Sequence, residues 1–202
     1  VFPLDDRVPD ELLETTAANA NKVRGLQAFK FLWEDFLLPL ARASQAGVTD
    51  AIDRYQPDLV VVDQQALAGA LVCRQRNTPW AMFATTSAGV TNPLAALPKV
   101  RAWLDEQLTQ LQEDAGVTPV EHPDRSPHCN IVFSSRLLVG AEADSLPSTM
   151  HFVGSAASGR SDDHIEFPWN KLTVHPRILV SLGTVNQDRG ERFYPTVCEA
   201  VE

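Results

Sequence analysis

The residue best suited to chemistry in this sequence is an aspartate at the end of an apolar run. Asp63 directly follows Val60-Val61-Val62, and in open parallel sheets ligands bind in the crevice outside the carboxyl ends of the strands. A carboxylate there can accept the N–H of a histidine, fix its tautomer and stabilise the imidazolium that forms when the other ring nitrogen removes a proton. Aspartate is also a common N-cap, and the strand alone favours a cap of the next helix over catalysis.

A second candidate site is Ser181-Leu182-Gly183-Thr184, at the end of another apolar run. Gly183 lets a ligand approach the backbone closely, and the two hydroxyls, with the free N–H groups of a following helix, can bind a diphosphate. Asp188 and Glu191 have capping-box spacing for that helix. A tight strand-to-helix turn without a ligand fits the segment equally well. No Walker A ending and no GxGxxG motif occurs in the sequence.

Small polar residues also follow a third apolar run. Phe83, Thr85, Thr86 and Ser87 should lie beside Asp63, and they are the best candidates for an apolar pocket with polar anchors. Other aromatic residues could line that pocket, although core packing is the commoner role for most of them: Trp33, Phe36, Trp80 and Trp103. The histidines offer less, because all but one lie in polar or proline-rich surroundings typical of surface loops: His122, His128, His164 and His175, with His151 beside a strand.

Composition excludes several classes of function. The 202 residues carry a formal net charge of -9, so there is no broad positive field for nucleic acid or an anionic membrane. Cys73, Cys129 and Cys198 stand far apart, which predicts neither a zinc site nor a disulfide framework and favours a reducing cytoplasm. No apolar run is long enough to span a bilayer, and the sequence contains no basic region followed by an apolar one of the kind found in signal peptides. No cofactor or metal is expected.

The order of elements predicts a layered α/β fold. A helical stripe runs from about residue 11 to 54, with breaks expected at Pro39 and Gly47. Residues 57–63 read as a strand buried on both faces, residues 66–72 as a small-residue helix and residues 79–84 as the next strand, together a βαβ unit. A helix is expected at 99–113, short strands at 130–133, 137–140 and 151–154, and, beyond a polar linker, a buried strand at 177–184 and a helix at 188–202.

In their order along the chain, three segments resemble the GT-B glycosyltransferases that use nucleotide sugars, particularly the bacterial macrolide-type group that glycosylates natural products. They are residues 57–63 with the small-residue helix and Thr78-Pro79-Trp80, the linker with Phe167-Pro168-Trp169, and residues 177–186. The resemblance implies a Rossmann-like acceptor domain at 1–154, incomplete at its N-terminus, a linker at 155–176, and the first strand and helix of a nucleotide-sugar domain at 177–202.

The resemblance also assigns roles to residues. Asp63 matches the aspartate that pairs with a catalytic histidine, and Ser181, Gly183, Thr184 and Asn186 match the loop that faces the diphosphate of a UDP- or dTDP-sugar donor. The implied reaction is inverting transfer to a hydroxyl of a hydrophobic acceptor such as a polyketide, macrolide or terpenoid. The catalytic histidine would lie upstream of Val1, and the later donor motif would follow Glu202. The polypeptide as given is therefore not expected to transfer sugar by itself.

Two other functions stay open at the level of sequence. A nucleotide-sugar epimerase can share the two-domain architecture while rearranging the donor, and product analysis without acceptor would separate it from a transferase. A non-catalytic binding module would keep the crevice and lack the base. A histidine in the first strand-to-helix turn would favour an enzyme over that module.

Overall fold

The contacts within the chain divide it into two units, Val1–Gly159 and Arg160–Glu202. The computed structural model describes residues 23–85, 87–155, 169–172, 175–183 and 190–201. Unit 1 contains the sheet and most of the helices, and unit 2 contains one short and one longer helix.

Unit 1 is built on a parallel sheet of four strands in the order β1-β2-β3-β4. The strands are β1 (Val60–Asp63), β2 (Trp80–Ala84), β3 (Asn130–Val132) and β4 (Met150–Phe152). Asp63 pairs in register with Phe83, and helix α4 (Leu67–Arg76) connects β1 to β2. The α/β class and the βαβ unit expected from the sequence are confirmed. Parallel strands place their carboxyl ends at one edge of the sheet, so the residues after β1 and β2 are neighbours there.

One long helical stretch precedes the sheet: α2 (Leu26–Phe31), the π-helical segment η1 (Leu32–Leu37) and α3 (Leu38–Tyr55). The predicted breaks at Pro39 and Gly47 are wrong, since the helix continues through both. Inside an α-helix, proline has no N–H to donate, and its ring would clash with the carbonyl four residues earlier. The wider π-helical turn just before α3 accommodates the ring of Pro39. Gly47 is buried in the helix and is not part of a turn. Residues 11–22 of the predicted helix lie outside the described part.

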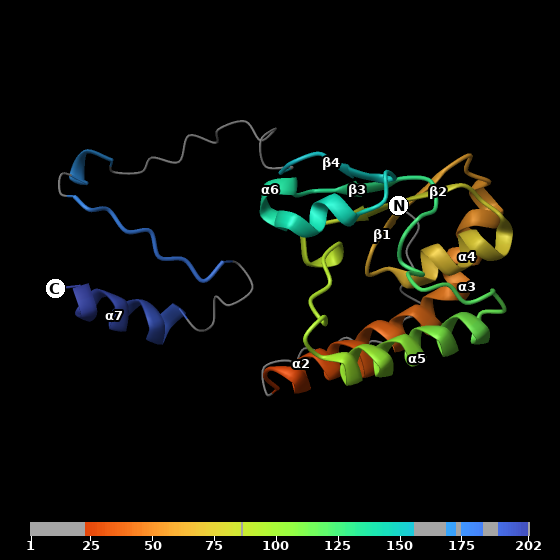
Figure 1. Cartoon of the computed structure of the whole chain (residues 1–202), viewed down its shortest axis with the longest axis horizontal. Helices are drawn as coiled ribbons and strands as arrows, with labels where there is room; N and C mark the ends of the chain where they lie inside the picture. The colour runs from red at the N-terminus through yellow and green to blue at the C-terminus, as the bar shows by residue number, and fades with distance from the viewer. Residues whose placement is uncertain (1–22, 86, 156–168, 173–174, 184–189, 202) are drawn as a thin grey trace. The chain divides into compact units, whose positions relative to one another are not determined.

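Helices α3, α4 and α5 (Pro98–Asp114) pack together beside the sheet (Figure 1). Their shared core contains Leu38, Ala41, Leu67, Leu71 and Leu111. The end of α5 is set by Gly116, whose φ of 68° favours glycine, and by two bonds of the Schellman type, from the Gly116 N–H to Glu113 O and from the Val117 N–H to Gln112 O. The predicted helix over 99–113 with its stop at Gly116 is confirmed.

Helix α4 packs closely on β1 because its facing position is a glycine. A methyl group at Gly69 would lie 2.8 Å from Cγ1 of Val62, too close for an unshifted contact. Val62 and most of α4 are buried in the core, together with Met82, Ala84 and Val132 of the neighbouring strands. The small-residue run of this helix is therefore a packing feature.

Two strand predictions in unit 1 need correction. Strand β1 is not buried on both faces, because Val61 is 54% exposed. Val62 packs against Gly69 of α4, and the adjacent Val61 points to the opposite face of the strand, which is open. Residues 137–140 form no strand: Ser135 caps a short helix, α6 (Arg136–Val139), and the 3-10 helix η3 (Gly140–Ser145) follows. A short apolar run does not by itself distinguish a strand from a helix.

Unit 2 contains a 3-10 helix, η5 (Trp169–Lys171), and helix α7 (Gly190–Val201). The helix predicted for 188–202 is confirmed over the residues described. The buried strand predicted for 177–184 is wrong over residues 177–183, which pair with no described segment. Ile178 and Leu179 there are 73% and 93% exposed. Apolar, β-branched composition favours a strand, but a strand also needs neighbours to pair with and to cover it.

Candidate functional site

A mainly apolar cavity of about 560 Å³ lies in unit 1, where the chain leaves β1 and β2. Asp63, Gln64 and Gln65 line it directly after β1, and Thr85 lines it directly after β2. Most of the remaining wall consists of apolar side chains from α2, η1, α4, α5 and the segment before α5: Leu26, Phe29, Leu32, Trp33, Leu37, Leu67, Leu94, Leu97, Leu104 and Leu108. A cavity of this size and lining is suited to a drug-sized apolar molecule.

Asp63 belongs to this cavity and does not cap the following helix. Its Oδ1 accepts the Gln65 N–H at 2.8 Å, and its main-chain oxygen accepts the Ala66 N–H at 2.9 Å. Ala66 is the N-cap of α4 and supplies no side-chain cap. The structure therefore contradicts the commoner of the two sequence interpretations, in which Asp63 caps α4. The local turn fixes one carboxylate oxygen and keeps the side chain at the cavity wall.

Of the described residues predicted to bind the acceptor, one lies in the cavity wall and two do not. Thr85 lines the cavity, and Thr86 lies outside the described residues. Phe83 lies in β2 opposite Asp63, but its ring packs edge-on against Phe133 with centroids 6.3 Å apart, away from the cavity wall. Ser87 begins the 3-10 helix η2 (Ser87–Gly89), where its carbonyl accepts the N–H of Val90, and it does not contribute to the wall.

Of the aromatic residues considered from sequence, Trp33 lines the cavity and Trp80 is buried in the core. Phe36 and Trp103 are not part of the wall.

Gln64 is a cavity residue that the sequence analysis missed. Its Nε2 donates to the main-chain oxygen of Gly89 and, at 2.7 Å, to Oδ2 of Asp124. A side chain at position 89 would collide with Gln64, so the glycine permits this contact. One amide thus joins the end of β1 to the segments after β2 and before β3.

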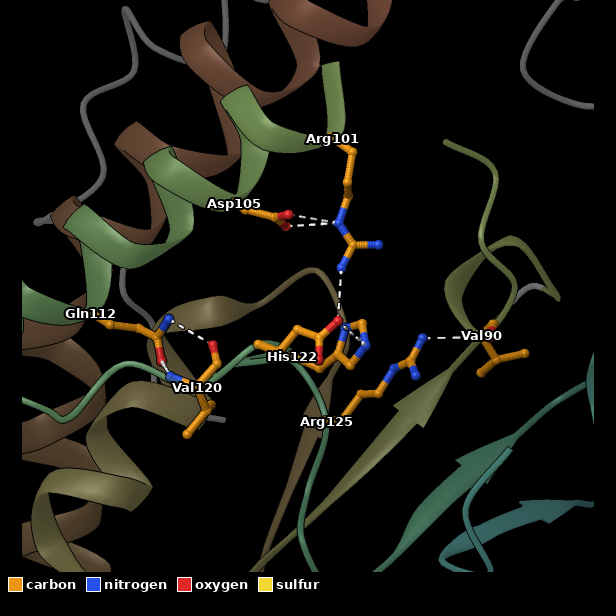
Figure 2. A network of polar contacts seen from close by, with 8 residues as sticks. Val90, Arg101, Asp105, Gln112, Val120, His122 and Arg125 are labelled. Atoms are coloured by element: carbon orange, nitrogen blue, oxygen red, sulfur yellow. Dashed lines mark hydrogen bonds and ion pairs between the residues drawn. The ribbon is translucent and has the colours of Figure 1, made fainter. Parts of the chain in front are cut away.

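Charged residues from α5 and the loop before β3 form the polar part of the wall (Figure 2). Nε of Arg101 lies 2.8 and 2.9 Å from the carboxylate oxygens of Asp105, and its Nη2 lies 3.3 Å from Oε1 of Glu121. Nε2 of His122 lies 3.7 Å from the same Glu121 oxygen. His122 was predicted to be a surface loop residue, and its proline- and aspartate-rich surroundings give no local signal of its place in the wall.

Burial lowers the pKa of His122 below its ordinary value of 6.5. Arg125 lowers that pKa further, whereas the carboxylates of Asp124 and Glu121 oppose the shift. The ring is therefore mainly neutral at neutral pH, with one nitrogen able to accept a hydrogen bond.

The loop that carries Glu121 and His122 is fixed at both ends. Oε1 of the fully buried Gln112 accepts the Val120 N–H at 2.8 Å, and its Nε2 donates to Val120 O at 3.1 Å (Figure 2). Further along, Asn130 Oδ1 accepts the Ser126 N–H at 2.8 Å and Asn130 Nδ2 donates to Ser126 O at 2.8 Å. These two amide clamps make the polar wall a defined surface.

Comparison with known proteins adds a structural likeness. No protein-family profile matches the chain, and no curated protein sequence matches it. Among solved structures, the chain is similar to CalG4, the calicheamicin glycosyltransferase, with 23% sequence identity and a TM-score of 0.47. The alignment covers 64% of this chain and 37% of that chain, so the chain spans well under half the length of that enzyme.

The predicted donor residues lie in unit 2. Gly183 has a φ of 69°, and its N–H donates to Oγ of Ser181 at 3.1 Å. The Leu182 N–H donates to the hydroxyl of Tyr194 at 3.2 Å, which ties the segment to α7. Thr184 and Asn186 lie outside the described residues, as does Asp188 of the expected capping box.

The described residues contain neither a cluster suited to a metal ion nor a helix suited to spanning a membrane. No group of three or more His, Cys, Asp or Glu side chains there could hold a metal ion. None of the helices described is both long and apolar enough to cross a membrane.

Proposed function

We propose that this chain is the acceptor-binding part of a GT-B glycosyltransferase that moves a sugar from a nucleotide-sugar donor to a hydroxyl of a hydrophobic small molecule. The observation that carries the proposal is the apolar cavity at the carboxyl ends of β1 and β2, with Asp63 in its wall. Its volume of about 560 Å³ suits a polyketide, macrolide or terpenoid acceptor. The order of the sequence motifs supports the same family.

In the proposed reaction the acceptor hydroxyl is deprotonated as it attacks the anomeric carbon with inversion. A histidine upstream of this chain takes the proton, and Asp63 stabilises the imidazolium. One oxygen of Asp63 is held by the Gln65 N–H, and the other makes no hydrogen bond within the described part of the chain. That second oxygen is the one we assign to the histidine. An Asp63 bonded in this way orients the base and stabilises its charge.

The donor is proposed to be a UDP- or dTDP-sugar, with its diphosphate at Ser181, Gly183, Thr184 and Asn186. The left-handed backbone of Gly183 supports this role, because it lets an anionic group approach main-chain N–H groups without steric conflict with a side chain. Charge that develops on the departing diphosphate would be stabilised there and at the N-terminus of the following helix. The separated free thiols support a reducing compartment such as the cytoplasm.

The test uses a protein that carries this chain together with the segment upstream of it, which holds the proposed histidine, and a complete donor domain. Product analysis by mass spectrometry, with a panel of apolar hydroxylated acceptors, should show acceptor plus one sugar. Asp63→Ala should lower kcat by about 10²–10⁴-fold, as expected for loss of support to a general base, with folding intact by circular dichroism. Phe83→Leu, on the paired strand outside the cavity, is the matched control. Turnover unchanged in Asp63→Ala removes that residue from the mechanism.

The same assay distinguishes transfer from isomerisation. With donor and no acceptor, an epimerase would convert the nucleotide sugar into its isomer, whereas a transferase would leave it unchanged apart from slow hydrolysis. Isomer formed without acceptor would refute the transferase proposal.

A further inference from the structure

A second cavity, of about 730 Å³, lies next to the first in unit 1. The same polar wall borders both, because six residues line each of them: Thr91, Asn92, Arg101, Glu121, His122 and Arg125. Beyond that wall the second cavity is bordered both by polar side chains, among them Arg74, Glu142, Ser145 and Thr149, and by apolar ones such as Leu146. The two cavities therefore meet at one strip of polar side chains that includes the charged groups of Arg101, Glu121 and Arg125.

The carboxylates in this strip and beside it already have hydrogen-bond or ion-pair partners. Asp105 and Glu121 both bind Arg101 (Figure 2). Oδ2 of Asp124, which lines only the first cavity, accepts the Gln64 amide at 2.7 Å. Arg101 is held from two sides by these carboxylates. It therefore has little capacity to bind an additional group.

Arg125 differs from Arg101 because its guanidinium makes only a long hydrogen bond and leaves a buried N–H donor without an acceptor among the described residues. Its Nη2 lies 3.4 Å from Val90 O, a long hydrogen bond, and its Nε is buried with no partner in the part of the chain that the structure describes. A guanidinium carries five N–H donors in a planar fork, and a buried donor without an acceptor is costly. The closest match to such a fork is a carboxylate or another anionic oxygen group.

We propose that the two cavities form one two-part site for an amphipathic anion, with its apolar ring system in the first cavity and its anionic oxygen group bound by Arg125 at the shared wall. The inference deepens the proposed function, and it rests on that function only in naming the bound molecule as the acceptor. It makes Arg125 a specificity-determining residue. It also predicts that acceptors with a carboxylate are preferred over neutral analogues of the same ring system.

Two dyes that differ in one group test the assignment on the chain as it is. 8-Anilinonaphthalene-1-sulfonate carries an anionic sulfonate, and N-phenyl-1-naphthylamine is its uncharged counterpart; both fluoresce in apolar surroundings. Arg125→Met should weaken binding of the sulfonate dye by about 10- to 100-fold, the range for loss of a charged hydrogen bond, and change binding of the neutral dye less than twofold. Unchanged binding of the neutral dye also shows that the cavity is intact.

Arg76→Met is the matched control, since it removes the same charge from a surface pair with Asp53 outside both cavities. It should leave both affinities within twofold. Equal weakening of the two dyes by Arg125→Met, or no weakening of either, would overturn the proposal.

A measurement on the unaltered chain covers the case in which Arg125→Met does not fold. Displacement of the neutral dye by 2-naphthoate and by 2-naphthylmethanol compares a carboxylate with a neutral alcohol on one ring system. The proposal expects the carboxylate to compete at least about tenfold better, and this preference to shrink as salt is raised. Equal competition refutes it. Neither result depends on sugar transfer, so failure here leaves the transferase proposal standing, and failure of transfer leaves the dye result standing.

Discussion

Replacing Gln112 by methionine should destabilise unit 1, because this buried amide holds the loop of the polar wall. Gln112 has no exposed surface. Its Oε1 accepts from the Val120 N–H and from Nη1 of Arg74, both at 2.8 Å, and its Nε2 donates to Leu108 O at 3.0 Å and Val120 O at 3.1 Å. Methionine has a similar length and no comparable donor or acceptor. The change therefore removes hydrogen bonds and leaves little cavity.

The expected decrease in the free energy of unfolding depends on which hydrogen-bond partners of Gln112 keep another bond. Leu108 O keeps its helical partner, and Arg74 keeps its bond to Thr118 O. Val120 is 49% exposed, so water can reach part of its backbone once the loop loosens. The three bonds that are lost without replacement are those to the Val120 N–H, to Val120 O and to Nη1 of Arg74. At about 1 kcal/mol each, with some further cost for donors left buried, they give a decrease of about 2–4 kcal/mol in the free energy of unfolding.

The assay is equilibrium unfolding in urea, followed by far-ultraviolet circular dichroism and by tryptophan emission, to which Trp80 of β2, 3% exposed, contributes. The matched control is Gln110→Met on the same helix, where the exposed amide bonds only to Asp114 among the contacts described, at 2.9 Å. That control should cost less than about 0.5 kcal/mol, as surface substitutions usually do. If Gln112→Met falls within about 0.5 kcal/mol of the control, the clamp does not hold the loop and the reasoning is refuted.

Two further outcomes are expected. Gly69→Ala should destabilise the chain when Val62 is present and much less in a Val62→Ala background, because the added methyl group would clash with Val62. A double-mutant cycle on the free energy of unfolding should give a coupling of about 1–2 kcal/mol, and additive effects would contradict the contact. The pKa of His122 is lower in the folded than in the unfolded state, because folding favours the neutral ring. The contribution of His122 to the free energy of unfolding is therefore fully present above about pH 6.5 and declines as the pH falls below that value. Unfolding at pH 7.5 and 5.5 should show a smaller decline for His122→Gln than for the unaltered chain, and equal declines would exclude His122 as a source.

Local sequence was sufficient to predict strands β1 and β2 and the edge of the sheet at which the cavity lies. The apolar runs before Asp63 and Thr85 are strands β1 and β2, and both of these polar residues line the cavity. This prediction worked because strand and helix periods, with the rule for parallel sheets, already place residues at one edge. The run Leu137-Leu138-Val139 failed for the opposite reason. Three apolar positions carry too little periodicity to separate a strand from the short helix that Ser135 caps.

The polar wall could not be predicted from local sequence. His122 and Arg125 lie in a loop whose composition is typical of a solvated surface, and nothing near them in the chain indicates burial. Their positions come from Gln112, ten residues before His122, and from the lock between Ser126 and Asn130. Gln64 likewise gains its role from Gly89 and Asp124, which are distant in sequence. Such sites depend on pairs that only the fold brings together.

The amphipathic stripe of the first helix shows why a pocket and a core are hard to tell apart in a sequence. Leu38, later in this helical stretch, is almost fully buried in the core, whereas Leu26 and Trp33 line the cavity. Hydrophobic periodicity reports only that a face avoids water, and either a packed neighbour or an apolar ligand satisfies it. Here the cavity wall opposite the first half of the stripe includes two polar side chains that are bound elsewhere: Arg101 to Asp105 and Glu121, and Gln64 to Gly89 O and Asp124. Replacing them should therefore alter ligand binding before it alters the core.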